Sequence, residues 1–244
     1  MTNPAAAILA RLKEVDAERR ARAARPELNA KVVALKEYQQ RRFAHTYADL
    51  LLSTRYGAAA RYFLDELYGP TDFSRRDGQF ARVAPTLARV FPHELADTIS
   101  ALAELHALSE ALDSAMAAEL PGERIAGVDY VRAWRAVGRP QDRARQIELT
   151  LGIAAHLDRV TRLPLLRRSL GLMRGPARAA GLAELQRALE AGFDTFKKMN
   201  GADEFIATIA AREKEFAAAL FASAPDLEPA GAAMQDALAR LPAA

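Results

Sequence analysis

Residues 92–122, PHELADTISALAELHALSEALDSAMAAELPG, are the stretch that decides the fold class of this chain. Apolar residues recur there in steps of three and four, which places them on one stripe of a helix with 3.6 residues per turn. The stripe consists of Leu95, Ile99, Leu102, Leu105, Leu108, Leu112 and Met116. Pro92 can occupy the first turn, where a missing N–H costs little, and Pro121-Gly122 ends the helix. We therefore expect a long central helix on which Leu102 and Leu105 are buried.

The same spacing recurs along most of the chain. Further helices are expected up to Arg25 and over 26–56, 127–138, 141–160, 163–174, 177–199, 202–222 and 229–241, separated by Gly and Pro residues. No stretch shows the period-two alternation of a strand, and no repeat of fixed period is present. The gaps between the expected helices are short. The fold class is therefore predicted as all-α, a single-domain irregular multi-helix bundle of about ten helices.

The ends of the chain differ from its middle in composition. Residues 1–25 are rich in charge and carry a narrow apolar seam of Ile8, Leu12 and Val15, which predicts an N-terminal docking helix. The alternative for this helix is contact with a partner. Residues 223–244 are rich in Ala and Pro and are expected to be loosely attached to a helical domain that covers residues 1–222.

Composition narrows the class of protein. Half of the residues are hydrophobic and 27% are charged, as in an ordinary globular domain. The chain has no cysteine, so disulfides and thiolate chemistry are excluded. No uncharged run approaches the ~18 residues needed to cross a bilayer, and the N-terminus lacks a basic segment before an apolar one. A cytoplasmic protein without membrane contact is expected. The net charge of +3 is small, so nucleic acid is an unlikely partner.

Residues 62–68, YFLDELY, resemble the signature Phe-Phe-Leu-Glu-Glu-Leu-Tyr of a bacterial family of uncharacterised proteins, the FFLEELY motif family. Tyr62 replaces Phe and Asp65 replaces Glu in this resemblance, and the following Gly69-Pro70 also fits it. The family supplies no catalytic residues. From the residues alone, this segment is a core helix with an acidic outer edge, or else part of a binding surface that includes Tyr62 and Tyr68.

The sequence lacks the common motifs that are typical of enzymes. It contains no phosphate-binding loop, no Gly-x-Ser-x-Gly elbow and no His-Glu-x-x-His or Glu-x-x-His pair. No catalytic residue, metal ligand or cofactor is therefore predicted. One residue has an alternative interpretation as a cofactor ligand, His106, because LAELHA (102–107) resembles the proximal-histidine helix of globins. A structural histidine and a haem ligand are both readings of this residue.

An arginine cluster is the strongest candidate for a binding surface. Between Asp158 and Glu184 the chain carries six arginines and no acidic residue. Arg167, Arg168, Arg174 and Arg178 are the candidates to hold an anion, because the guanidinium fork suits oxyanions. The alternative is that they pair with carboxylates of other helices, such as Asp65, Glu66 or Glu148.

These observations predict a helical binding or interaction module rather than an enzyme. Its partner is expected to be an unidentified protein or an anionic small molecule at the arginine cluster, and a homo-oligomer is also open. The alternative is a globin-like protein that binds haem through His106.

Overall fold

The computed structural model describes residues 4–66, 78–83, 93–163, 166–222 and 232–242, and these residues form helices and no strand. The all-α prediction is confirmed. The helices are α1 (Pro4–Ala23), α2 (Pro26–Thr46), α3 (Ala48–Leu52), α4 (Gly57–Glu66), α6 (His93–Glu119), α7 (Gly127–Val137), α8 (Pro140–Thr161), α9 (Leu166–Leu172), α10 (Arg174–Ala179), α11 (Ala183–Met199), α12 (Asp203–Phe221) and α13 (Ala232–Ala239).

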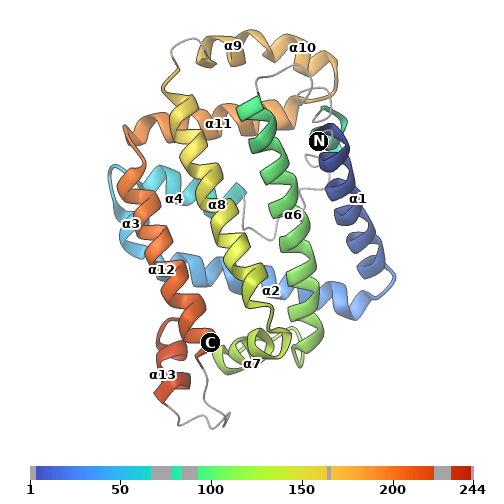
Figure 1. Ribbon diagram of the computed structural model, residues 1–244, viewed down its shortest axis with the longest axis vertical. Helices are drawn as coiled ribbons and strands as arrows, with labels where there is room; N and C mark the ends of the chain where they lie inside the picture. Colours follow the sequence, from blue (N-terminus) through green and yellow to red (C-terminus); the bar gives the residue numbers. More distant parts are fainter. Residues whose placement is uncertain (1–3, 67–77, 84–92, 164–165, 223–231, 243–244) are drawn as a thin grey trace.

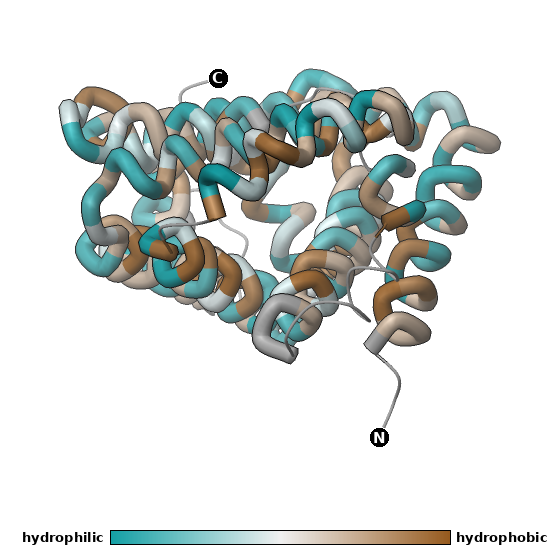
Figure 2. The backbone as a smooth tube through the Cα atoms, turned by 90° about the horizontal axis from the view of Figure 1, so that it is seen from above, coloured by the Kyte–Doolittle hydropathy of each residue, from teal (hydrophilic) through white to brown (hydrophobic). Residues whose placement is uncertain are grey.

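Two long helices, α6 and α8, lie side by side in the middle of the bundle (Figure 1). Helix α1 packs on the far side of α6, α12 packs on the far side of α8, and α2 contacts α6. Helices α9 and α10 contact α11 at one end of the molecule, and α7 and α13 contact each other at the other end. Most helices in Figure 2 carry both hydrophobic and hydrophilic residues along their length. This mixture is typical of amphipathic helices, which bury one side and expose the other.

The predicted central helix is α6, and its stripe is only partly buried. Ile99, Leu112 and Met116 are buried, as expected. Leu102 and Leu105 are only half-buried, so the prediction for these two residues is wrong. Both residues border a cavity, which leaves part of their surface uncovered.

Apolar packing among the described residues is divided into three clusters. The largest joins α2, α6, α7, α12 and α13, and within it the rings of Tyr38 and Tyr130 stack with their centroids 4.9 Å apart. A second cluster joins α3, α4, α8, α11 and α12 around Phe196 and Phe205. The third holds α1 on α6 through Ile8 and Leu12. Each fully buried large side chain contributes about 1.5–3 kcal/mol to stability, so the clusters fix the frame that surrounds the cavity.

Three boundaries differ from the expected ones. The helix predicted over 26–56 ends at Thr46, because Tyr47 leaves the helical region with φ −114° and ψ 26°. Gly175-Pro176 lies in the first turn of α10 and does not end a helix, since a proline is tolerated there. Helix α9 ends earlier, at Leu172, and a further break divides the predicted helix 177–199 at Gly181, whose φ of +70° suits glycine.

The C-terminal segment packs more closely than expected. Helix α13 contacts α7 and α12, and both Ala237 and Leu241 are buried in the largest cluster. Loose attachment is therefore wrong for residues 235–242. The sequence obscured this because small apolar residues such as alanine are compatible with both a packed helix and a loose tail. Residues 223–231 lie outside the described part of the chain.

Candidate functional site

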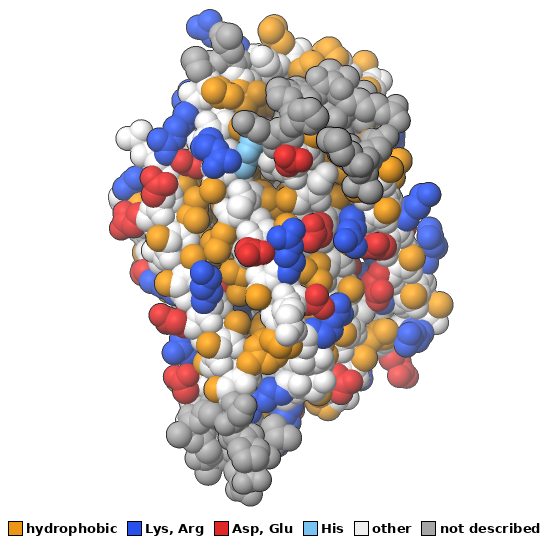
Figure 3. All heavy atoms as spheres, viewed as in Figure 1, with side chains coloured by type: hydrophobic (Ala, Val, Ile, Leu, Met, Phe, Trp, Pro, Cys, Tyr) orange, Lys and Arg blue, Asp and Glu red, His pale blue; other side chains and the backbone are white. Residues whose placement is uncertain are grey.

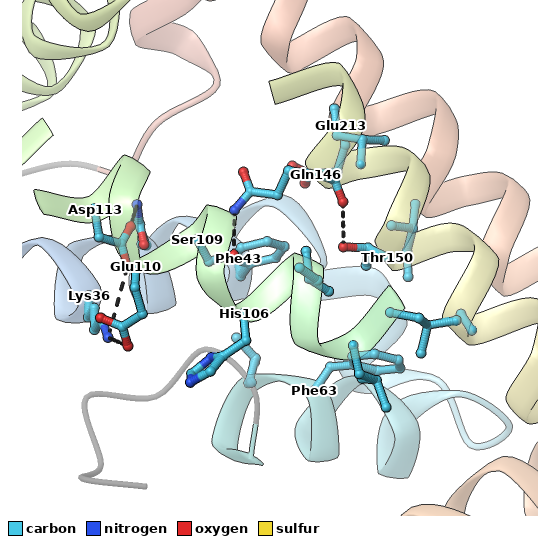
Figure 4. A pocket seen from close by; sticks show the side chains of 18 of the residues that line it. Lys36, Phe43, Phe63, His106, Ser109, Glu110, Asp113, Gln146, Thr150 and Glu213 are labelled. Atoms are coloured by element: carbon cyan, nitrogen blue, oxygen red, sulfur yellow. Dashed lines mark hydrogen bonds and ion pairs between the residues drawn. The ribbon is translucent and has the colours of Figure 1, made fainter. Parts of the chain in front are cut away.

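A cavity of about 770 Å³ lies between the helices of the bundle, and α2, α4, α6, α8, α11 and α12 contribute to its wall. This volume falls within the range of roughly 300–1,000 Å³ that is typical of small-molecule sites. Figure 4 shows that its wall is divided: Lys36, Glu110 and Asp113 gather on one side, and Phe63 lies on the other. The cavity is therefore amphipathic.

Apolar side chains make up most of one part of the wall. It includes Phe43, Phe63, Leu102, Leu105, Ile147, Leu151, Ile206 and Ile209. Leu102, Leu105, Ile147 and Leu151 are all half-buried although they lie on the two central helices. The exposed part of each of these side chains is the part that borders the cavity. An apolar group that entered the cavity would gain about 25 cal/mol for each Å² it covers.

The polar part of the wall connects three helices by side-chain hydrogen bonds. Gln146 of α8 donates from Nε2 to Ser109 Oγ of α6 at 2.8 Å, and these two side chains meet in Figure 4. Arg143 donates from Nη1 to Gln146 Oε1 at 3.1 Å. Gln39 of α2 donates from Nε2 to Asp113 Oδ1 at 3.2 Å. The wall thus carries one hydrogen-bonded chain of three side chains, Arg143, Gln146 and Ser109, and one separate pair, Gln39 and Asp113.

Glu110 is surrounded by three cations. Its carboxylate accepts from Arg19 Nη2 at 3.1 Å, from Lys36 Nζ at 3.1 Å and from Arg22 Nη2. Burial acts to raise the pKa of Glu110, but the charges of Lys36, Arg22 and Arg19 outweigh it and lower the pKa to about 2. The carboxylate is therefore ionised at neutral pH and joins α1 and α2 to α6.

A second buried pair links α2 to α12. Arg42 donates from Nη1 to Glu213 Oε1 at 2.5 Å, and Tyr47 donates its hydroxyl to the same oxygen at 2.6 Å. The Arg42 guanidinium also lies 4.4 Å from the centroid of the Phe216 ring. Arg42 is thus held by a carboxylate and by an aromatic face.

Arg143 differs from the other basic side chains of the wall. It is only 4% exposed and its guanidinium lies 4.0 Å from the Trp134 ring centroid. Within the part of the chain that the structure describes, it donates to the Gln146 amide and pairs with no carboxylate, and its Nη2 has no hydrogen-bond partner. Burial lowers the pKa of Arg143, which is the expected effect on a cation removed from water.

Asp113 and Tyr130 complete this region. Burial raises the pKa of Asp113, and the nearby cations Lys36 and Arg143 oppose that effect. Burial likewise raises the pKa of Tyr130, and the charges of Arg42 and Arg143 act against it. Arg42, Arg143, Tyr130 and Asp113 therefore influence one another's charge states. Because these groups are shielded from water, a new charge beside them would interact strongly with all four.

The predicted arginine cluster is partly engaged in ion pairs. Arg167 makes a two-point pair with Asp194, with Nε to Oδ1 at 2.7 Å and Nη2 to Oδ2 at 2.9 Å. Arg174 donates from Nε to Glu190 Oε1 at 2.8 Å, and Arg167 also contacts Glu190. Arg167 and Arg174 thus converge, but on acidic residues of α11 and not on an empty surface.

The other two arginines of the cluster are exposed. Arg168 on α9 and Arg178 on α10 form no ion pair with the acidic residues that the structure describes. On the face shown in Figure 3, basic and acidic side chains are intermixed. Of the four predicted residues, Arg167 and Arg174 are therefore in ion pairs, and Arg168 and Arg178 are exposed.

Tyr62 lies at the cavity, and Tyr68 lies outside the described residues. The hydroxyl of Tyr62 donates to the carbonyl oxygen of Ala188 at 3.1 Å, which ties α4 to α11. A Cβ on Gly192 would come within 2.8 Å of the Tyr62 hydroxyl oxygen, so this close approach of two helices depends on glycine. Tyr62 thus has a packing role beside the cavity.

His106 also lines the cavity. Its Nε2 lies 3.4 Å from Arg19 Nη2, and in Figure 4 its ring is turned away from Ser109 and Gln146. Iron ligation through Nε2 would bring a metal cation against this guanidinium, which is electrostatically unfavourable. Among the described residues, no group of three or more His, Asp or Glu side chains is arranged to hold a metal ion.

Sequence reasoning missed the polar wall of the cavity, although a signal for it exists. Steps of four, three, four and three lead from Leu102 through His106, Ser109 and Asp113 to Met116. Three polar residues therefore occupy positions in phase with the apolar stripe. Polar side chains on the buried face of a helix indicate either a buried network or a site. Arg143, Gln146 and Thr150 follow the same spacing on α8.

The fold and this cavity define an all-helical protein with an amphipathic cavity between its helices. A family model described as a domain of unknown function, DUF8198, matches residues 18–227. The chain belongs to this family. No curated protein matches it, and no solved structure does. None of the described helices combines the length and the hydropathy that crossing a membrane would need.

Proposed function

We propose that this protein binds a small amphipathic organic molecule in the cavity between its helices. The observation that supports this function is the divided wall, with apolar side chains such as Phe63 and Leu151 on one part and hydrogen-bonding groups such as Ser109 and Gln146 on another. A folding core would fill this volume, because packed interiors leave few voids larger than a water molecule. A cavity of about 770 Å³ offers both surface for an apolar body and donors for a polar group.

The cavity is a better candidate than the arginine cluster. Arg167 and Arg174 already contact Asp194 and Glu190, so an incoming anion would compete with two carboxylates. Arg168 and Arg178 leave a smaller exposed pair that could contact a protein partner. We therefore assign the binding role to the cavity.

Haem stays an alternative occupant, through His106. The cavity borders this residue, but Arg19 stands beside the nitrogen that would face iron. The distinction needs one absorption spectrum after haem is added to the purified protein. A Soret band that is lost on His106→Ala would favour haem over the amphipathic molecule.

The absence of cysteine supports a reducing compartment, and we propose the cytoplasm. The resemblance of residues 62–68 to the FFLEELY motif likewise supports a bacterial origin. Both proposals concern where the binding takes place and leave the cavity argument unchanged.

The test is binding of a neutral apolar dye, N-phenyl-1-naphthylamine, whose fluorescence rises in an apolar site. Two substitutions at Thr150, a half-buried residue of the wall, form a matched pair. Thr150→Val keeps the volume of the side chain, whereas Thr150→Phe fills part of the cavity. We expect the dye to bind the natural protein and Thr150→Val alike, and to bind Thr150→Phe at least about tenfold more weakly, the loss of ~1.4 kcal/mol.

Circular dichroism of each variant shows whether the helices are intact. Dye binding that is equal in Thr150→Val and Thr150→Phe, with both folded, would locate the dye elsewhere and contradict the proposal. Absence of binding to the natural protein would contradict it as well.

A further inference from the structure

We propose that the molecule bound in the cavity carries one oxyanionic group, of the carboxylate kind, and that Arg143 receives this group. This inference rests on the proposed function and specifies the chemical class of the ligand. It follows from three independent features of the described residues: the charges of the wall, the unpartnered donors, and the position of Arg143 between the polar and aromatic parts of the wall.

The charges of the wall are unequal. Five basic side chains and three acidic ones border the cavity, namely Arg19, Arg22, Lys36, Arg42 and Arg143 against Glu110, Asp113 and Glu213. Glu110 is occupied by three cations and Glu213 by Arg42. Asp113 lies 4.0 Å from Lys36. Among these described residues, Arg143 is the basic side chain left without a carboxylate within ion-pair distance, and its Nη1 donates to the Gln146 amide instead.

The unpartnered buried groups of the wall are all donors. Arg22 Nε, Arg42 Nε, Trp134 Nε1 and Arg143 Nη2 have no hydrogen-bond partner among the described residues, and all four residues border the cavity. Three of these residues lie close together, since Arg143 lies over the Trp134 ring and that ring lies 5.9 Å from Phe216, which Arg42 covers. A buried donor without an acceptor is energetically costly, because it has lost its hydrogen bonds to water. A ligand that supplies oxygen lone pairs would relieve this cost, whereas a ligand with N–H groups would not.

The number of unpaired cations sets the charge of the ligand. One unpaired guanidinium is matched by a monoanion, and a planar carboxylate can accept two parallel N–H bonds from it. Burial disfavours the charged form of Arg143, so an anion at hydrogen-bond distance would oppose this effect. The apolar wall around Phe63 and Leu151 then contacts the rest of the molecule.

The experiment compares ligands that share a ten-carbon chain and differ in the head group. Decanoate, decanamide, decyl phosphate and decyltrimethylammonium are titrated by calorimetry into the full natural chain, below their micelle-forming concentrations. Because Trp134 is the single tryptophan and lies at the cavity, its fluorescence reports occupancy in parallel. We expect decanoate to bind at least about tenfold more tightly than decanamide, and decyltrimethylammonium to bind most weakly. Decyl phosphate should not exceed decanoate, since only one cation is unpaired.

Substitutions then assign the head group to Arg143. Arg143→Met removes the charge at similar length and should weaken decanoate about tenfold or more, while changing decanamide by less than about threefold. Arg143→Lys should retain most of the decanoate affinity. The control is Arg135→Met on α7: Arg135 also has a buried nitrogen without a partner, and it does not border the cavity among the described residues. This control should leave both affinities unchanged.

The outcomes separate this inference from the proposed function. If none of the four compounds binds, the cavity is not a site for amphipathic molecules and both proposals fail. If decanoate, decanamide and the cationic compound bind with equal affinity, the cavity is a site but the preference for an anion is wrong. If decanoate is preferred but Arg143→Met has no effect, another group receives it. Should Arg143→Met not fold, the head-group series on the natural chain still decides between an anionic and a neutral ligand.

Discussion

Glu110 and Asp113 lie three residues apart on α6, and the same type of side chain has opposite energetic effects at the two positions. Glu110 contacts Arg19, Arg22 and Lys36, whereas Asp113 has one cation at 4.0 Å and an amide hydrogen bond. The pKa of Glu110 is lowered to about 2, and the pKa of Asp113 is raised by burial. Pairing, rather than burial alone, therefore decides whether a carboxylate stabilises this wall.

Glu110→Gln should destabilise the fold at pH 7, and Asp113→Asn should not. The shift of the Glu110 pKa from 4.5 to about 2 corresponds to about 3 kcal/mol of stability. Because this pKa is lower in the folded protein, that stability is fully present above pH 4.5 and is lost as the pH falls towards 2. Asp113 has the reverse sign, so removing its charge should leave stability unchanged or raise it at pH 7.

Urea unfolding of both variants at pH 7 and at pH 3 measures these effects. The difference between Glu110→Gln and the natural protein should shrink at the lower pH. An equal loss of stability in Glu110→Gln and Asp113→Asn at pH 7 would show that the two carboxylates have the same role and would contradict this account.

Two glycines show how position within an element decides the effect of the same substitution. A Cβ on Gly57, at the start of α4, would lie 2.7 Å from the backbone oxygen of Leu51. A Cβ on Gly152, within α8, would meet nothing within 4 Å. The first glycine permits the sharp approach of α3 to α4, and the second only weakens its helix.

Gly57→Ala is expected to lower the free energy of unfolding by about 1–3 kcal/mol, because backbone must move to relieve the contact. Gly152→Ala is expected to raise it by about 0.5–1 kcal/mol through helix propensity. Thermal unfolding followed by circular dichroism measures both. Equal melting temperatures for the two alanine variants would contradict the packing described at the α3–α4 turn.

At the scale of elements, the sequence predicted helices well and their partners poorly. The period of three and four identified α6, α8 and α12 within a few residues, because amphipathic spacing is a local property. The end of α2 at Thr46 was missed because it depends on Tyr47, whose hydroxyl reaches Glu213 more than 160 residues later. The alternative that the arginines pair with carboxylates of other helices was stated, but the residues named for it, Asp65, Glu66 and Glu148, did not include the partner of Arg167, Asp194, for the same reason. Local residue spacing does not predict which residues that are distant in the sequence come into contact.

At the scale of the whole molecule, the helices enclose a volume that no single helix indicates. The in-phase polar residues Ser109 and Asp113 were visible in the sequence, but whether they meet a partner or a cavity depends on how α2 and α8 approach α6. Leu102 and Leu105 were predicted to be buried on the assumption that an apolar stripe is always covered by protein. They are half-buried because the cavity occupies the space that a neighbouring side chain would fill.

The central claim is that this cavity holds an amphipathic monoanion, and a crystal structure with 10-bromodecanoate tests it most directly. The bromine atom gives an anomalous signal that marks the end of the chain opposite the carboxylate. We expect one strong bromine peak among Phe63, Leu151 and Ile209, with carboxylate density at hydrogen-bond distance from Arg143. Bromine peaks found only on the outer surface, with no density for the compound in the cavity, would contradict the claim.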